Sequence, residues 1–219
     1  MRWLPLTNLV ALLCLAGCAA PGGTPSSGAT SPQPETDRVI ASASVPAASG
    51  SGAAMTDAAL APPEVAAAYG RAVLLLETGD QSGAESEFKR FIAAHPGYAG
   101  PHVNLSIIYT AQGRLDDAQA AIDTALTLNP QSAEAMNQQG ILHRRNGQFT
   151  EAESAYLKAI TVRPDYPLAH LNLGILNELY FGRLVDALEF YRSYQLLTPD
   201  EDPTVARWIT DLTRRTGQN

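Results

Sequence analysis

The chain has 219 residues and a formal net charge of −7, with 15 lysines and arginines against 22 aspartates and glutamates. An acidic chain without a basic stripe of interleaved aromatic residues is not drawn to phosphate backbones, so the composition argues against nucleic-acid binding. The only two cysteines are Cys14 and Cys18. A disulfide or a cysteine–metal site in the rest of the chain is therefore excluded.

The first feature in chain order is an apolar N-terminal stretch. Arg2 precedes an apolar run over residues 9–16, and the letters LAGC end at Cys18. The run is too short for a mature transmembrane helix, and small residues precede the cysteine as a signal peptidase requires. This pattern resembles a bacterial lipoprotein signal peptide (residues 1–17) ending in a lipobox. An ordinary secretory signal is the alternative.

The lipoprotein resemblance has three implications. The thiol of Cys18 is expected to carry a diacylglyceryl group, and the new amine after cleavage is expected to be acylated as well. Several acyl chains anchor a protein stably, because each buried CH₂ contributes roughly 0.8 kcal/mol. Residue 19 is Ala19 and not aspartate, which by the sorting rule of such lipoproteins favours the outer membrane, with the folded part in the periplasm.

Residues 18–61 form a second compositional region. They are rich in Ala, Ser, Gly, Pro and Thr and carry few charges and almost no large apolar side chains. Such a segment cannot bury enough apolar surface to fold, so the sequence predicts a disordered tether behind the lipidated cysteine.

A repeat with a period of about 34 residues occupies the remainder of the chain. Four prolines fall 34, 34 and 35 residues apart, and glycines, alanines and large apolar residues recur in phase with them. The prolines are Pro96, Pro130, Pro164 and Pro199, and the glycines are Gly79, Gly113, Gly147 and Gly182. A self-similar unit of this length is typical of a helical solenoid.

The second unit shows the pattern best. It reads His102-x2-Leu105-Ser106-x2-Tyr109, followed by Ala118-x3-Ile122. This resembles the tetratricopeptide repeat, a helix-turn-helix of 34 residues. The resemblance implies an all-α, right-handed α-solenoid of four units over about 65–98, 99–132, 133–166 and 167–201, within a domain at 62–216.

Small residues recur where the two helices of each predicted pair should touch. The first helices carry a small residue at one recurring position, where it should face the recurring alanine of the second helix and let the two backbones approach. These residues are Ala72, Ser106, Gly140 and Gly174. The recurring glycines stand where each first helix ends, and glycine adopts the left-handed C-cap conformation without steric cost.

The fourth unit contains one extra residue. Pro167 to Gly174 stays in register, whereas Gly182 comes one residue late. The sequence therefore predicts a π-bulge or a widened turn between Gly174 and Gly182. Such bulges are often found at functional sites, and a tolerated insertion at a helix end is the alternative.

A capping helix is predicted at about 203–215. Asp202 followed by Pro203 is typical of an N-cap and a first helical position. Apolar residues then recur at helical spacing and would cover the end of the fourth unit, as solenoids require. They are Val205, Trp208, Ile209 and Leu212.

Catalytic motifs are missing from the sequence. His102 and His170 hold the same repeat position on the packing face but lie two repeats apart, so helix layers separate them and they cannot share a metal. His143 lies at another packing-face position, and His95 has no acidic or cysteine partner at motif spacing. We expect core or half-buried histidines, no metal, no cofactor and no enzymatic activity.

A binding surface is the remaining candidate. In tetratricopeptide repeat proteins one face of the first helices lines a concave groove. Here one recurring position on that face is an aliphatic row of Val73, Ile107, Ile141 and Ile175. The position beside it is an amide row of Asn104, Gln138 and Asn172, with Gly70 in the first unit, and its amides could bind a peptide backbone. The predicted groove residues are Tyr69, Val73, Asn104, Ile107, Asn137, Gln138, Ile141, Arg144, Leu171, Asn172 and Ile175. The alternative is that the aliphatic row is partly buried between neighbouring first helices and the amides merely solvate the helix edge.

These features together predict an outer-membrane lipoprotein that presents a peptide-binding solenoid to the periplasm. By resemblance to pilotin-type lipoproteins, it would be an assembly factor for a pilus, a secretion system or another envelope machine. An adaptor that organises peptidoglycan enzymes and a self-associating structural lipoprotein, a homo-oligomer, are the alternatives. The expected partner is a protein or peptide of the cell envelope.

Overall fold

The computed structural model describes residues 61–198 and 202–218. The predicted signal peptide, Cys18 and the tether lie outside the described residues. Within the described part, every regular element is helical. The α-helices are α3 (Pro63–Glu77), α4 (Gln81–Ala94), α5 (Ala99–Ala111), α6 (Leu115–Leu128), α7 (Ala133–Arg145), α8 (Phe149–Val162), α9 (Pro167–Leu176), α10 (Leu184–Leu197) and α11 (Pro203–Thr216), and a π-helix, η1 (Asn177–Phe181), follows α9.

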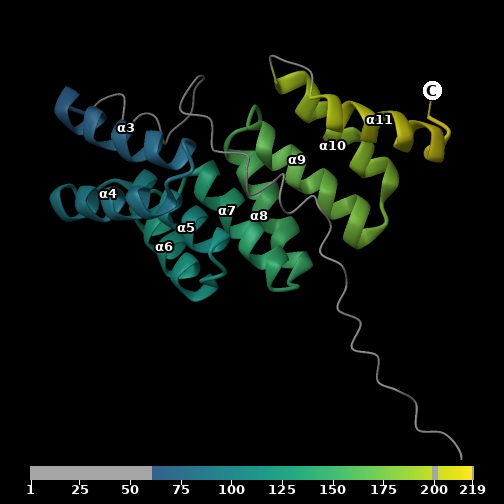
Figure 1. Ribbon diagram of the computed structural model, residues 1–219. Helices are drawn as coiled ribbons and strands as arrows, with labels where there is room; N and C mark the ends of the chain where they lie inside the picture. The colour runs from purple at the N-terminus through teal and green to yellow at the C-terminus, as the bar shows by residue number, and fades with distance from the viewer. Residues whose placement is uncertain (1–60, 199–201, 219) are drawn as a thin grey trace, which may run out of the picture. The chain divides into compact units, whose positions relative to one another are not determined.

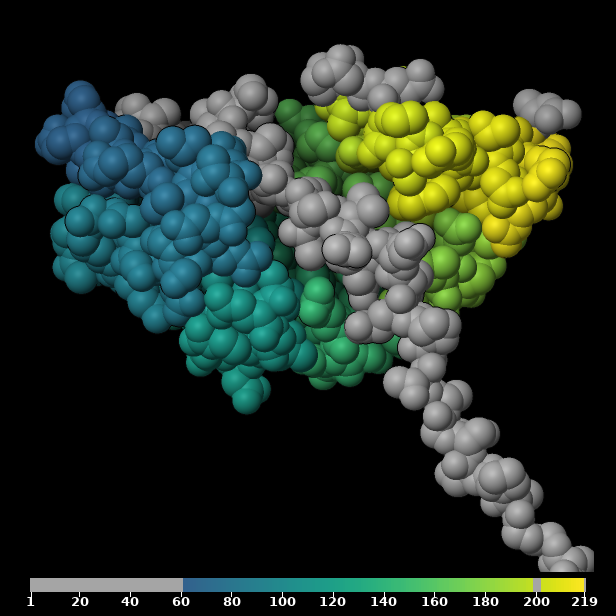
Figure 2. All heavy atoms as spheres, viewed as in Figure 1, coloured from purple at the N-terminus to yellow at the C-terminus, as the bar shows by residue number. Residues whose placement is uncertain are grey.

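The helices stack in pairs that follow the repeat (Figure 1). α3 packs against α4, α5 against α6, α7 against α8 and α9 against α10, and the second helix of each pair also packs against the first helix of the next. α11 packs against α10 and ends the stack. Figure 2 shows α3 and α4 at one end of this stack and α10 and α11 at the other. The predicted all-α solenoid with a capping helix is confirmed.

The turns inside the units are closed by the predicted glycines. Their φ angles are positive: Gly79 85°, Gly113 74°, Gly147 74° and Gly182 66°. In the first three units the N–H after the glycine donates to a carbonyl five residues back, for example from Arg114 to Tyr109 at 2.9 Å. This is the hydrogen bond of a Schellman cap, and it satisfies a carbonyl that the helix end leaves open.

The fourth unit closes its turn with a wider ring. Arg183 donates its N–H to the carbonyl of Asn177, six residues back, at 2.9 Å. The residues between them form η1, so the predicted π-bulge is confirmed. The extra residue is absorbed at the end of the first helix, and Gly182 still reaches the left-handed conformation that starts the next helix.

Each helix pair packs a large residue of the second helix against a small residue of the first. Phe88, Ile122 and Tyr156 are completely buried and Tyr191 is 1% exposed. A Cβ built on Gly140 would lie 2.4 Å from Cε1 of Tyr156, and one on Gly174 would lie 2.6 Å from Cδ1 of Tyr191. The aromatic ring of the second helix is therefore the closest neighbour of these two glycines, and not the recurring alanine that we expected.

The sizes of these partners are matched unit by unit. The third and fourth units combine glycine with tyrosine, whereas the second combines Ser106 with Ile122 and the first Ala72 with Phe88. Interiors are close-packed, so a larger side chain on one helix requires a smaller one on its partner. The side-chain sizes at these two repeat positions therefore vary together from unit to unit.

The predicted capping helix is also confirmed. The Asp202 carboxylate accepts N–H bonds from Thr204 at 2.8 Å and from Val205 at 3.3 Å, which caps α11. Val205 and Leu212 are fully buried, and Trp208 and Ile209 are half-buried in the same cluster. The apolar stripe of α11 thus faces the fourth unit, as its spacing predicts.

Candidate functional site

The candidate site is the face of α3, α5, α7 and α9 that carries the eleven predicted groove residues, and we call it the first-helix face. In the full chain, seven of these residues are 6% exposed or less: Asn104, Asn137, Gln138, Arg144, Leu171, Asn172 and Ile175. The other four, Tyr69, Val73, Ile107 and Ile141, are half-buried.

The amide row joins successive first helices to one another. Asn104 Nδ2 donates to the Tyr69 hydroxyl at 2.6 Å, and Asn172 Nδ2 donates to Asn137 Oδ1 at 3.0 Å. Since these amides are buried, the bonds are made away from water, and each bond satisfies an N–H donor that would be costly to leave unpaired. The amides therefore do not simply solvate the helix edge; they connect neighbouring units.

The third unit has Gln138 at the position where the second and fourth units have asparagine, and the hydrogen-bond acceptor explains this difference. The residue that accepts the amide bond in the first and third units is Tyr69 or Asn137, but the second unit has Val103 at this repeat position, and valine cannot accept. Gln138 is one methylene longer than asparagine, and its Nε2 reaches the Thr110 hydroxyl instead, at 3.0 Å. The amide row is thus continuous through all three junctions between units.

The aliphatic row lies in two environments. Val73 and Ile107 are half-buried and pack against the apolar cluster of the first two units, and Ile141 packs against a cluster of the third and fourth. Ile175 is 1% exposed and belongs to a cluster that includes residues of α10 and α11. The row is therefore partly exposed over three units and closed at the fourth.

The ion pair of the third unit was not predicted from the sequence. Arg163 and Glu134 form an ion pair of 2.6 Å with side chains only 13% and 14% exposed, and the Arg163 guanidinium lies 4.1 Å from the ring centre of Tyr166. At the turn side of α7, Arg145 Nη1 donates to the carbonyl of Thr110 at 3.2 Å. These contacts tie α7 to its neighbours on both sides.

Ion pairs of this kind recur at a fixed spacing in the sequence. Glu85 with Arg114 and Glu153 with Arg183 are further ion pairs, at 3.2 and 2.6 Å, and in every case the partners are 29 or 30 residues apart. This separation is slightly less than one repeat, so a search for opposite charges at that spacing would have found them. The Arg114 and Lys89 contacts hold the pKa of Glu85 below its ordinary value, with the hydrogen bond from Lys89 as the largest cause.

The phenols near this face are shifted by their surroundings. Burial raises the pKa of Tyr69 to about 12, the hydrogen bond from Asn104 opposes that rise, and the charge of Glu134 adds to it. Burial also raises the pKa of Tyr166, again with a contribution from Glu134. Both phenols therefore remain neutral in the physiological range and serve as hydrogen-bonding groups.

The histidines are separate from one another and engaged locally. His102 is half-buried, and burial lowers its pKa. His143 Nδ1 lies 2.9 Å from Gln148 Oε1, and His170 Nε2 lies 2.9 Å from the carbonyl of Pro164. Over residues 61–198 and 202–218, no group of three or more His, Cys, Asp or Glu side chains is placed to hold a metal ion.

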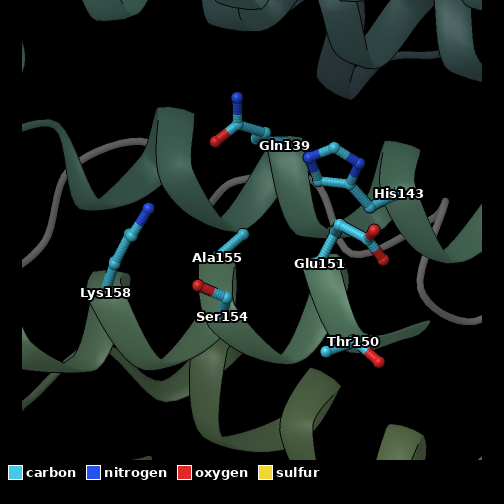
Figure 3. A pocket seen from close by; sticks show the side chains of 7 residues that line it. All are labelled: Gln139, His143, Thr150, Glu151, Ser154, Ala155 and Lys158. Atoms are coloured by element: carbon cyan, nitrogen blue, oxygen red, sulfur yellow. The ribbon is translucent and has the colours of Figure 1, made fainter. Parts of the chain in front are cut away.

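A shallow depression of about 360 Å³ lies on the third unit (Figure 3). It is lined by Gln139, His143, Thr150, Glu151, Ser154, Ala155 and Lys158. Gln139 holds the repeat position of Leu105 and Leu173, which are 5% and 1% exposed in their units. The lining of the depression therefore includes a half-buried polar side chain, Gln139, where two other units have a buried leucine.

In the part of the chain that the structure covers, each helix is too short or too polar to cross a bilayer.

The family model of the tetratricopeptide repeat matches residues 52–99, 104–161 and 137–206. No curated protein is detectably similar in sequence to the chain. Among solved structures, PilF of Pseudomonas aeruginosa is similar with a TM-score of 0.62 and 20% identity, over 70% of this chain and 69% of PilF.

Two further solved structures share the fold. A thermophilic TPR protein of Thermus thermophilus is 26% identical with a TM-score of 0.61, over 70% of this chain and 83% of that protein. MamA of Desulfovibrio magneticus RS-1 is 16% identical with a TM-score of 0.54, over 71% of this chain and 87% of the MamA chain. The chain therefore belongs to the tetratricopeptide repeat family, and its helical domain is a protein–protein interaction scaffold.

Proposed function

We propose that this protein is an outer-membrane lipoprotein that holds its solenoid in the periplasm and binds a peptide segment of an envelope protein on the first-helix face. In this role it is an assembly factor for a pilus, a secretion system or another envelope machine. The LAGC motif at Cys18 supports the anchor, and residue 19 supports the outer membrane. The fold shared with PilF and the pilotin-like architecture support the assembly role by analogy.

One observation carries the binding proposal: the aliphatic row on the first-helix face. Val73, Ile107 and Ile141 recur in phase and keep part of their surface exposed. Side-chain hydrogen bonds that the amides donate to a phenol, a threonine hydroxyl and another amide join α3, α5, α7 and α9 to one another. A rigid row of apolar side chains beside polar groups is a surface on which an extended or helical segment can bury its own apolar residues.

Photo-crosslinking in living cells tests this binding. A photoreactive amino acid at Ile107 or Ile141 should give adducts with an envelope protein, identified by mass spectrometry of the product. Thr124 is the matched control, because it lies on α6 with its side chain exposed. Adducts from Thr124 with none from Ile107 or Ile141 would contradict binding on the first-helix face.

The anchor has its own test. Cys18→Ser should abolish lipid attachment and signal processing and should move the protein out of the outer-membrane fraction. Fractionation with mass spectrometry of the N-terminus measures this. Mature protein that still appears in outer-membrane fractions after the substitution would sink the lipoprotein assignment.

Self-association through the same aliphatic row is the second candidate function, and the half-exposure of Ile107 and Ile141 is the observation that favours it. Size-exclusion chromatography with light scattering separates the two. A dimeric parent that becomes monomeric with Ile107→Ser and Ile141→Ser supports self-association, whereas a monomeric parent supports binding of another protein.

A further inference from the structure

The fourth unit differs from the others in what covers its first helix. Ile175 is 1% exposed, although its counterparts Val73, Ile107 and Ile141 are all half-buried. Ile175 and Leu171 belong to one apolar cluster with residues of α10 and with Val205 and Leu212 of α11. The first-helix face therefore ends where α11 closes the stack.

The π-helix carries the polar contact that reaches α11. Glu178 Oε2 accepts a hydrogen bond from the Tyr191 hydroxyl of α10 at 2.9 Å, and Glu178 Oε1 lies 3.4 Å from Arg215 Nη1 of α11. Tyr191 itself packs on Trp208 of α11, with ring centres 5.3 Å apart. One carboxylate thus connects η1, α10 and α11.

The insertion explains the placement of this carboxylate. In the first three units the last turn of the first helix closes over five residues, and in the fourth it closes over six, from Arg183 to Asn177. The additional residue widens the turn that carries Glu178 without changing the glycine cap at Gly182. The π-turn thus carries a carboxylate that contacts both α10 and α11, and the other helix pairs form without such a turn.

We propose that α11 is a lid over the fourth-unit end of the first-helix face and that Glu178, presented by the π-helix, is its latch. The inference rests on the proposed function, because it concerns the same binding face. With α11 closed, the partner segment meets the aliphatic row of three units. With α11 open, Leu171 and Ile175 extend the row by a fourth unit and admit a longer apolar segment.

The energetics suit a lid. α11 is terminal and packs mainly on α10, and terminal elements open at lower free energy than the middle of a domain. Arg215 is 44% exposed and Glu178 19% exposed, so their ion pair adds only modest stability in water. Opening also exposes the buried Val205 and Leu212, so the closed position is the more stable one and a bound apolar segment must replace that buried surface.

Thiol labelling measures the opening. The test uses the full chain with Cys14→Ser and Cys18→Ser, so that an introduced Ile175→Cys or Ile107→Cys is the only thiol. Arg215→Ala and Glu178→Gln should raise the maleimide labelling rate of Ile175→Cys about 2- to 5-fold, the range expected for losing a partly exposed ion pair at a chain end. The labelling rate of Ile107→Cys should stay the same.

Arg214→Ala is the matched control. Arg214 is 81% exposed and pairs with Asp211 on the same helix, whereas Arg215 also reaches Glu178. The control should change the labelling rate of Ile175→Cys by less than about twofold, as expected for an exposed pair within one helix.

A second measurement keeps the test decisive if labelling is slow. Hydrogen exchange of the full chain should show faster exchange of α11 amides in Arg215→Ala, with α5 to α8 unchanged. Unchanged labelling and unchanged α11 exchange in both latch variants would overturn the proposal, and so would an equal rise at Ile107→Cys, since that indicates general unfolding. Neither measurement uses a partner, so failure of the lid is distinguishable from failure of the crosslinking test of binding.

Discussion

The second and fourth units are built on the same repeat, yet equivalent residues have different surroundings. Ile107 and Ile175 hold one repeat position, and the first is half-buried while the second is 1% exposed. Ser106 has Ile122, which is fully buried, at the equivalent position of its second helix, whereas Gly174 lies against the ring of Tyr191. Repeat position thus determines which helix face a residue occupies, and the neighbouring element determines its environment.

The largest expected effect comes from the contact of glycine with tyrosine that the second unit does not have. Gly140→Ala should lower the free energy of unfolding by about 2 to 3 kcal/mol, because its Cβ would lie 2.4 Å from the ring of the fully buried Tyr156. Urea denaturation with circular dichroism measures the loss.

The second unit also supplies the rescue for this variant. The double variant Gly140→Ser with Tyr156→Ile reproduces the pair Ser106 and Ile122 and should recover most of the stability. Gly70→Ala is the control: nothing lies within 4 Å of the added Cβ, and alanine in a helix interior should add about 0.5 to 1 kcal/mol. Equal losses at Gly140 and Gly70 would contradict the size-matching account.

The next effect concerns the junction between the second and third units. Thr110→Val keeps the shape of the side chain and removes the acceptor for Gln138 Nε2, which leaves a buried donor unpaired. The expected loss is about 1 to 2 kcal/mol, from the cost of an unsatisfied buried polar group. Thr124→Val is the matched control, since that hydroxyl is exposed and bonds only within α6; a similar loss in both would rule out a special role for the junction.

A smaller effect on stability is expected at the shallow depression, where the third unit has Gln139 in place of the leucine of the second and fourth units. Gln139→Leu should raise the free energy of unfolding by about 1 kcal/mol, because leucine buries more apolar surface where Leu105 and Leu173 are buried in their units. The converse change, Leu105→Gln, should destabilise the protein. Thermal unfolding of both variants measures the pair, and a destabilising Gln139→Leu would show that the depression needs its polar lining.

The smallest effect is a pH dependence in the second unit. Burial lowers the pKa of His102 in the folded chain, so the unfolded chain takes up the proton first. The contribution of His102 is therefore fully present above its ordinary pKa of about 6.5 and is lost as the pH falls below that value. His102→Gln should make the decline in melting temperature between about pH 7.5 and pH 5.5 shallower; an unchanged decline would contradict this assignment.

The features that can be predicted from the amino-acid sequence depend on local or periodic chemistry. The period of the prolines predicts the helix pairs, the recurring glycines predict left-handed caps, and the late Gly182 locates the π-helix. Asp202, Pro203 and the apolar spacing behind them predict α11 with its buried face. These features can be predicted because each depends on residues a few positions apart or on a register that four copies of the unit share.

The tertiary structure alone decided which side chains meet across units. The bond from Gln138 to Thr110 and the bond from Asn172 to Asn137 join residues 28 and 35 apart, and the repeat pattern predicts both faces but not the pairing. The same holds for the ring of Tyr191 against Gly174 and for the contact of Glu178 with Arg215. Such contacts depend on the helix spacing and on side-chain length to within one methylene, and these are set only when the units stack.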